Sequence, residues 1–307
     1  MSRERSVPII TRAIAVLVIA WAAPARADTE RFAVVIGHNT GAADEQQLRY
    51  AESDAQRFAD LLGDIGGVPV ENQVVLRGRT AEQVRRAMIS TNERIRTSLR
   101  SGAGSVLFVY YSGHGDADAL HLGDTRLPLR ELESLVRGSP ADVRVLVIDS
   151  CRSGSITRIK GGRPAPPLAL ATAAPLLGEG MIVLTASTLS EDAQESDQLG
   201  GSFFTHYLLS GLRGAADEDG DRIVTLAEAF SYTRDQTIIA SSRTLAGTQH
   251  PTFHYDLRGR ADLVLADLGG ATSAHGKLTL PAGVTWLVTR TMSSRTVVGE
   301  IAADARR

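Results

Sequence analysis

The sequence predicts an α/β protein, a three-layer sandwich in which a mainly parallel sheet lies between two layers of helices. Short runs of almost wholly apolar residues alternate with longer stretches of helical spacing from residue 31 onward. Strands that are apolar on both sides need cover on both faces, and such strands are typical of parallel sheets. After residue 260 the sequence becomes richer in strand-forming residues, and a short β-rich C-terminal extension is expected at 261–307.

The predicted elements follow one another with strands and helices in alternation. The strands are expected at 31–37, 72–78, 104–113, 143–150 and 180–187. The helices are expected at 46–62, 80–99, 127–137, 202–212 and 225–240. Each strand run is short and ends at Gly or Ser, as buried strands often do. The helical stretches repeat apolar residues every three or four positions, and Thr80 is a suitable N-cap for the second helix.

The N-terminal 27 residues are predicted to be a secretory signal peptide. Three arginines precede or open an apolar stretch at 13–23, and Pro-Ala-Arg-Ala closes it at 24–27. Cleavage after Ala27 is expected, with export to the periplasm or the extracellular space. An uncleaved anchor is the alternative, but the apolar stretch is short for a bilayer. No stable membrane span is expected after cleavage, and residues 28–260 form the main domain.

The composition excludes some partners and favours others. A formal net charge of -2 offers no basic surface for nucleic acid, and aromatic residues make up only 5% of the chain. No nucleic-acid partner is therefore expected. The 307 residues are 43% hydrophobic, which is enough for one large core. A monomeric globular protein is the expectation.

Residues after the ends of parallel strands are the candidates for chemistry, because sites in open α/β sheets gather at the carboxyl ends of strands. His114 follows the third predicted strand and stands between Gly113 and Gly115. Glycines on both sides allow a sharp turn and the close approach of a substrate backbone. Cys151 follows the fourth strand, within 149–154. If these strands are neighbours, the two side chains meet across a cleft.

Cys151 is the only cysteine in the chain. An exported chain with one cysteine cannot form an internal disulfide, which leaves a buried structural cysteine or a reactive thiol. A nearby imidazole favours the reactive thiol, because a thiolate–imidazolium pair lowers the pKa of the thiol. The backbone N–H groups of Gly115 and Cys151 are then candidates to hold an oxyanion.

Two stretches resemble the His and Cys motifs of the caspase-like cysteine peptidases of clan CD, especially the metacaspases: VLFVYYSGHG (106–115) and VLVIDSCRSG (145–154). The resemblance covers about residues 31–258 and implies the caspase-hemoglobinase fold. It also implies an endopeptidase acting on protein or peptide substrates, in which Cys151 attacks the scissile carbonyl and His114 transfers the proton. The alternative is a catalytically silent caspase-like binding or scaffold module, against which the intact pair argues.

The same resemblance implies a substrate preference. Metacaspases cut after Arg or Lys and use acidic residues in the first specificity pocket; the matching positions here are Asp54 and Asp149. Desolvated carboxylates favour a bound guanidinium, which donates charge-assisted hydrogen bonds. Caspases proper instead place an Arg on the first-helix segment, and Arg49 lies close to that position. Acidic specificity therefore stays open as the alternative.

A long segment at 155–179 separates the fourth and fifth predicted strands. It is rich in Gly, Pro and Ala, which is typical of an exposed loop. Caspases are cut in the corresponding loop during maturation. Arg158, Lys160 and Arg163 are therefore candidate autoprocessing positions, if the specificity pocket is acidic.

The chemistry of a Cys-His pair requires no cofactor, but an acidic stretch at 217–228 raises calcium activation as a possibility. Its residues match calcium-loop positions 1, 3, 5, 9 and 12, and they are Asp217, Asp219, Asp221, Thr225 and Glu228. Position 6, which needs Gly for the turn, is Arg222. A polar loop that caps the helix from Thr225 is the favoured alternative.

Overall fold

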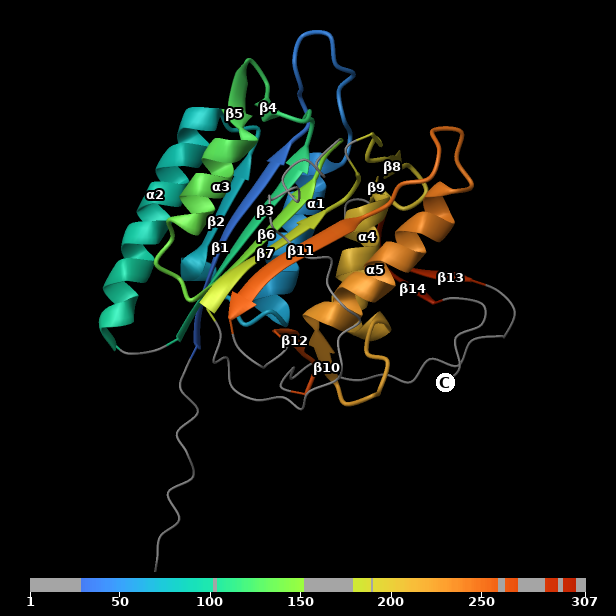
Figure 1. Ribbon diagram of the computed structural model, residues 1–307. Coiled ribbons are helices and arrows are strands. Elements are labelled where there is room, and N and C mark those ends of the chain that lie inside the picture. The colour runs from blue at the N-terminus through green and yellow to red at the C-terminus, as the bar shows by residue number, and fades with distance from the viewer. Residues whose placement is uncertain are drawn as a thin grey trace, which may run out of the picture.

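The computed structural model describes residues 29–101, 104–151, 179–188, 190–258, 263–269, 285–291 and 295–301. Its centre is a six-stranded sheet in the order β11-β7-β6-β3-β1-β2 (Figure 1). In this order the strands are Thr252–Arg258, Glu179–Thr185, Val143–Asp149, Gly104–Gly113, Thr29–His38 and Gln73–Arg77. Strand β11 is antiparallel to β7, and all other neighbours are parallel. The predicted mainly parallel sheet is confirmed.

Helices cover both faces of this sheet. One face carries α2 (Ala81–Ser98) and α3 (Leu129–Arg137), and the other carries α1 (Ala51–Asp64), α4 (Phe203–Ser210) and α5 (Leu226–Ser241) (Figure 1). Successive side chains of each strand point to opposite faces, so Tyr110 packs on the α1 side and Tyr111 on the α2 side. The three-layer sandwich is therefore confirmed. No helix in the described part of the chain is long and apolar enough to cross a bilayer.

The described residues also form short strand pairs and helical turns outside the central sheet. The two-stranded pairs are β4 (Ala119–Leu122) with β5 (Thr125–Pro128), β8 (Glu195–Ser196) with β9 (Gly201–Ser202), β10 (Ile223–Thr225) with β12 (Val264–Asp267), and β13 (Trp286–Thr291) with β14 (Arg295–Ile301). Short 3₁₀ turns lie at Val70–Asn72 and Leu99–Ser101, and a π-helical turn, Gly211–Ala215, extends α4. The β4–β5 hairpin follows β3 directly, which places it beside the carboxyl end of the sheet (Figure 1).

The register of the central strands determines where the residues of the candidate site lie. Strand β3 pairs with β6 so that Ser112 lies opposite Asp149, and β1 pairs with β3 so that His38 lies opposite Gly113. Three strands therefore end at the same level. The residues that follow β3 and β6 emerge side by side at the carboxyl edge of the sheet, as expected for neighbouring strands.

Three local features differ from the sequence expectations. Helix α1 begins at Ala51 rather than at residue 46, because the N–H groups of Arg49 and Tyr50 bind the Glu195 carboxylate and residues 46–50 remain a loop. The β4–β5 hairpin was not predicted, and residues 127 and 128, expected to begin a helix, lie at the end of β5. Strand β11 was also missed, since it is an edge strand whose polar residues do not form an apolar run.

Two neighbouring residues of α2 differ in burial, and this difference predicts different effects of substitution. Met88 is fully buried between α2 and the sheet, whereas Ile89 beside it is 54% exposed. The Met88→Ala substitution is expected to lower the free energy of unfolding by about 2–5 kcal/mol, because it leaves a cavity. The Ile89→Ala control is expected to change it by no more than about 0.5 kcal/mol. Urea unfolding of both variants measures the difference, and equal losses would contradict the described packing.

Candidate active site

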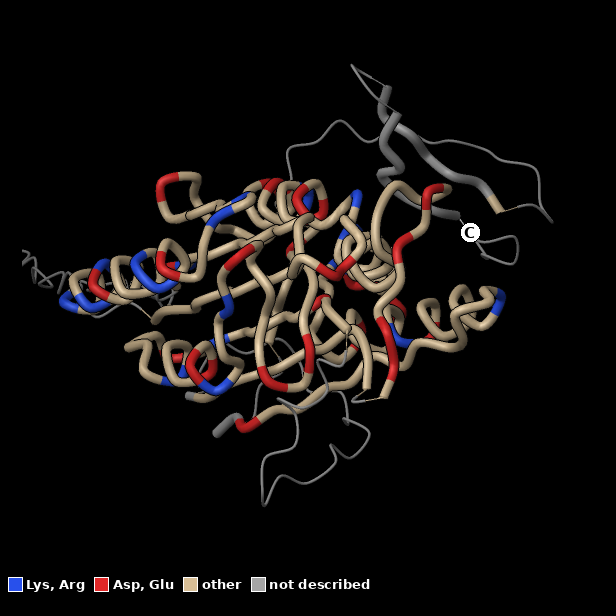
Figure 2. The backbone as a smooth tube through the Cα atoms, turned by 90° about the horizontal axis from the view of Figure 1, so that it is seen from above, with Lys and Arg blue, Asp and Glu red and all other residues tan. Residues whose placement is uncertain are grey.

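A cavity of about 50 Å³ lies at the carboxyl ends of β3 and β6, and both His114 and Cys151 line it. The other lining residues are Leu48, Ser112, Gly113, Asp149, Ala193, Gln194, Glu195 and Ser202. Figure 2 looks down on this edge of the sheet and shows acidic positions on the loops around its centre. The structure therefore brings the two predicted catalytic side chains to one cavity that also contains carboxylates.

His114 is oriented by the loop that follows β1. Its Nε2 lies 2.7 Å from the backbone carbonyl oxygen of Gln46. A carbonyl oxygen can only accept a hydrogen bond, so Nε2 carries the hydrogen and the neutral ring has its lone pair on Nδ1. Gly41 packs against the same ring, and a Cβ at that position would lie 2.6 Å from His114 Cδ2. His114 is thus held as a base whose free nitrogen is Nδ1.

Cys151 lies two residues after Asp149, the last residue of β6. Its Sγ lies 3.9 Å from the carbonyl oxygen of Ala193. Burial raises the pKa of the thiol to about 11, and the negative charges of Asp192 and Asp149 act in the same direction. The resting site therefore holds a neutral thiol at neutral pH, where the sequence analysis expected a lowered pKa. The cause is desolvation by the packed loops.

The two predicted oxyanion donors are close together. Gly115 packs against the residue that precedes the nucleophile, and a Cβ on Gly115 would lie 3.1 Å from Ser150 Oγ. Within the described residues, the backbone N–H groups of Gly115 and Cys151 donate no hydrogen bond. Cys151 lines the cavity and Gly115 does not, so the role of the two N–H groups as oxyanion donors stays a prediction.

Asp149 lies in the wall of the cavity and is 3% exposed. Its Oδ2 accepts hydrogen bonds from the hydroxyl groups of Ser202 and Thr205, the latter at 2.6 Å. Thr205 is in turn 2.6 Å from the Tyr110 hydroxyl. Burial raises the pKa of Asp149 to about 6, although the two hydroxyl donors oppose this rise. Asp149 is therefore a fixed carboxylate that is charged at neutral pH.

Asp54, the second predicted pocket residue, lies one layer behind the cavity wall. It is fully buried, forms an ion pair with Arg57 of the same helix, and accepts the Ser202 N–H at 2.9 Å. Arg57 also donates to the carbonyl of Gly200 at 3.0 Å. Burial raises the pKa of Asp54 to about 7, and nearby Asp149 adds to the rise. Ser202 connects the two carboxylates, but only Asp149 reaches the cavity.

Glu195 is the acidic cavity residue that the sequence analysis did not single out. Its two carboxylate oxygens accept the N–H groups of Arg49 and Tyr50, both at 3.0 Å, at the start of α1. The only signal was its place in the acidic stretch after the fifth strand, 191–197. The Arg49 side chain instead pairs with Asp197 at 2.9 Å, with both side chains 69% exposed. Arg49 does not line this cavity.

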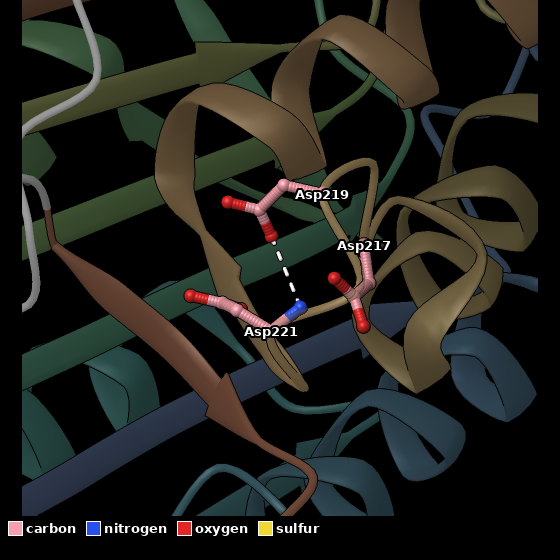
Figure 3. Close-up of side chains that lie close together, drawn as sticks. All are labelled: Asp217, Asp219 and Asp221. Carbon is pink, nitrogen blue, oxygen red and sulfur yellow. Dashed lines mark hydrogen bonds between the residues drawn. The ribbon is translucent and has the colours of Figure 1, made fainter.

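Three of the four candidate calcium ligands come together. The carboxylate oxygens of Asp217, Asp219 and Asp221 lie within 4.8 Å of one another, and Figure 3 shows them on one loop. Arg222, at the position that needs Gly, has a left-handed φ of 68°. Glu228 instead closes the capping box of α5 with Thr225. The three aspartates are the residues here that could hold a cation.

The candidate autoprocessing residues Arg158, Lys160 and Arg163 lie outside the described residues. The signal peptide at 1–27 does so as well. The structure therefore bears on the catalytic pair, the oxyanion donors, the pocket carboxylates and the acidic loop alone.

Comparison with known proteins agrees with this architecture. Caspase-1 from Spodoptera frugiperda superposes with a TM-score of 0.57 at 15% sequence identity, over 84% of this chain and 99% of that one. A pro-caspase-1 structure gives a TM-score of 0.49 at 16% identity, over 73% of this chain and 90% of that one. No curated protein sequence matches the chain.

The likeness to caspase-1 from Spodoptera frugiperda shows the fold, and a family model shows the family. The model of the caspase domain matches residues 30–261, which contain the sheet except for its first residue, Thr29, together with both motif strands and the cavity. Members of this family are cysteine peptidases, and His114 and Cys151 stand where the two strand ends meet. The chain belongs to the caspase domain family of peptidases.

Proposed function

We propose that the protein is an exported cysteine endopeptidase that hydrolyses peptide bonds after Arg or Lys. The observation that supports this most is the shared cavity, in which His114 and Cys151 lie beside the carboxylates of Asp149 and Glu195. A nucleophile and a base in one cavity support hydrolysis. Two carboxylates in its wall support a positively charged P1 side chain.

The chemistry starts from the neutral thiol of Cys151. As Sγ of Cys151 attacks the scissile carbonyl carbon, its proton passes to Nδ1 of His114, and the N–H groups of Gly115 and Cys151 bind the oxyanion. The C–N bond then breaks, and His114 gives the proton to the departing amine. A water molecule attacks the thioester and passes a proton to His114, the S–C bond breaks, and Sγ regains the proton.

Substrate selection rests on the cavity wall. Asp149 lines the cavity, and the hydroxyl groups of Ser202 and Thr205 hold its carboxylate in place through Oδ2. A P1 guanidinium or ammonium can donate to the carboxylates of Asp149 and Glu195. Asp54 contributes less direct charge, because Arg57 already neutralises it. The pocket is therefore negative, which disfavours Asp at P1.

Three further features belong to the proposal. Cleavage after Ala27 would release a monomeric enzyme outside the cytoplasm. Autoprocessing would take place at Arg158, Lys160 or Arg163. Calcium would act through the loop of Asp217, Asp219 and Asp221, whose carboxylates lie together.

Hydrolysis of fluorogenic peptides tests the activity. Peptides with Arg or Lys at P1 are expected to be cleaved, and the otherwise identical peptide with Asp at P1 is not. The Cys151→Ala variant is expected to lose at least about a thousandfold in kcat/KM, because the nucleophile is removed. Each assay is run with and without calcium, which tests the acidic loop in the same experiment.

The outcomes separate the alternatives. No turnover of any peptide, with or without calcium, would favour the scaffold role over the enzyme. Cleavage after Asp alone would contradict the negative pocket and leave the peptidase in place. A rate that Cys151→Ala does not change would exclude Cys151 as the nucleophile.

The pKa of Asp149 predicts how P1 recognition depends on pH. Because burial raises this pKa to about 6, the carboxylate is charged above pH 6 and loses its charge below it. The affinity of a P1-Arg peptide for the Cys151→Ala protein is expected to fall about tenfold between pH 7.5 and pH 5. The Asp149→Asn variant should bind more weakly and lose most of this dependence. Titration calorimetry measures both, with a P1-citrulline peptide as the neutral control; equal pH profiles for the two proteins would contradict the assignment.

A further inference from the structure

The loop that follows β1 encloses the His114 ring with more than the Gln46 carbonyl. Glu45, the preceding residue, places its Oε1 3.7 Å from His114 Nδ1, the nitrogen that receives the proton during attack. Gly41 lies against the ring, and a Cβ there would lie 2.2 Å from Glu45 Oε2. One short loop thus supplies an acceptor for Nε2, a packing surface and a carboxylate beside Nδ1.

The Glu45 carboxylate is itself held in place. Its Oε2 accepts the backbone N–H of Ala42 at 2.6 Å, and both carboxylate oxygens lie 2.8 Å from His121 Nδ1. Burial alone would raise the pKa of Glu45, but these two donors and the nearby His114 lower it below its usual value. Glu45 is therefore a fixed negative charge at neutral pH.

His121 connects this carboxylate to the β4–β5 hairpin. Its Nε2 lies 3.0 Å from Asp116 Oδ2, and Arg126 contacts both groups. The backbone N–H of His121 donates to the carbonyl of His114 at 2.9 Å. The Tyr111 hydroxyl also donates to that carbonyl, at 2.6 Å. The hairpin therefore fixes Glu45 and the backbone of His114 together.

We propose that Glu45 is a positioning residue that acts through His114, fixing the ring and stabilising its protonated form while Cys151 attacks. An opposite charge at 3.7 Å favours the imidazolium over the neutral ring. Because the resting thiol is neutral, Glu45 stabilises the imidazolium only when the proton has left Sγ of Cys151. Its role in turnover rests on the proposed peptidase activity, but the effect of Glu45 on the His114 ring does not.

The other ionisable groups around His114 do not supply this charge. His38 ends β1 beside it, and burial lowers the pKa of His38, so this ring is neutral at neutral pH. The Cys151 thiol, across the cavity, is neutral as well. His121 reaches His114 through the shared carboxylate of Glu45. Glu45 is therefore the anionic side chain that lies beside Nδ1 within the described residues.

NMR titration of the histidine ring tests the inference without turnover. In full-length Cys151→Ala protein, the Glu45→Gln substitution is expected to lower the pKa of His114 by about one pH unit. Gln keeps the shape and an acceptor oxygen but removes the charge. The matched control is Asp44→Asn, which removes the same charge from the exposed preceding residue and should leave the pKa of His114 unchanged. An unchanged pKa in Glu45→Gln would overturn the proposal.

Kinetics of the protein with Cys151 intact give a second readout. In Glu45→Gln, kcat/KM is expected to fall about tenfold, mainly through kcat, and the acid limb of its pH profile should move to lower pH. A fall with no movement of the acid limb would indicate a merely structural role. If Glu45→Gln does not fold, Glu45→Asp is used instead. Its shorter side chain keeps the charge but moves it away from the ring, so the pKa of His114 should fall by a smaller amount. Absence of wild-type turnover would contradict the proposed peptidase, while the NMR result would still decide the role of Glu45.

Discussion

The parallel pairing of β3 with β6 fixes where the residues of the candidate site leave the sheet. Its register sets Ser112 opposite Asp149, so the residues that follow each strand emerge at the same level. A slip of one residue would exchange the two faces of a strand, moving Tyr110 and Tyr111 to the wrong cores. The burial of apolar side chains on both faces of the sheet therefore fixes the register of β3 and β6. This register places His114 and Cys151 close together.

Desolvation sets the pKa values of the ionisable groups in and behind the cavity wall. The same packing that buries Asp149, Asp54 and Cys151 raises the pKa of each, so that at neutral pH Asp149 is charged, the Cys151 thiol is neutral and Asp54 is close to its pKa of about 7. Hydroxyl groups, backbone N–H groups and Arg57 offset the cost of burying the two carboxylates. The cavity thus combines a neutral thiol with carboxylates in its wall.

The layered fold and the shared cavity of His114 and Cys151 could be predicted because local sequence carries them: apolar runs give the strands, and each of the two residues follows such a run. The place of Glu195 in the cavity could not be predicted, because it follows from the packing of a loop against the start of α1. The pairing of Asp54 with Arg57 was not foreseen either, because helical spacing alone does not show that both are buried. Strand β11 was missed because edge strands lack a continuous apolar run.

Covalent capture tests the central claim most directly. A peptidyl chloromethyl ketone alkylates a cysteine much faster when its P1 side chain is bound and a base assists the thiol than when it meets an exposed, unassisted thiol. With Arg at P1, intact mass spectrometry should show one label per chain, peptide mapping should place it on Cys151, and Asp149→Asn should slow the reaction. The same reagent with Asp at P1 should label far more slowly. Equal labelling by both reagents, or no labelling of Cys151, would contradict a catalytic cysteine beside a negative pocket.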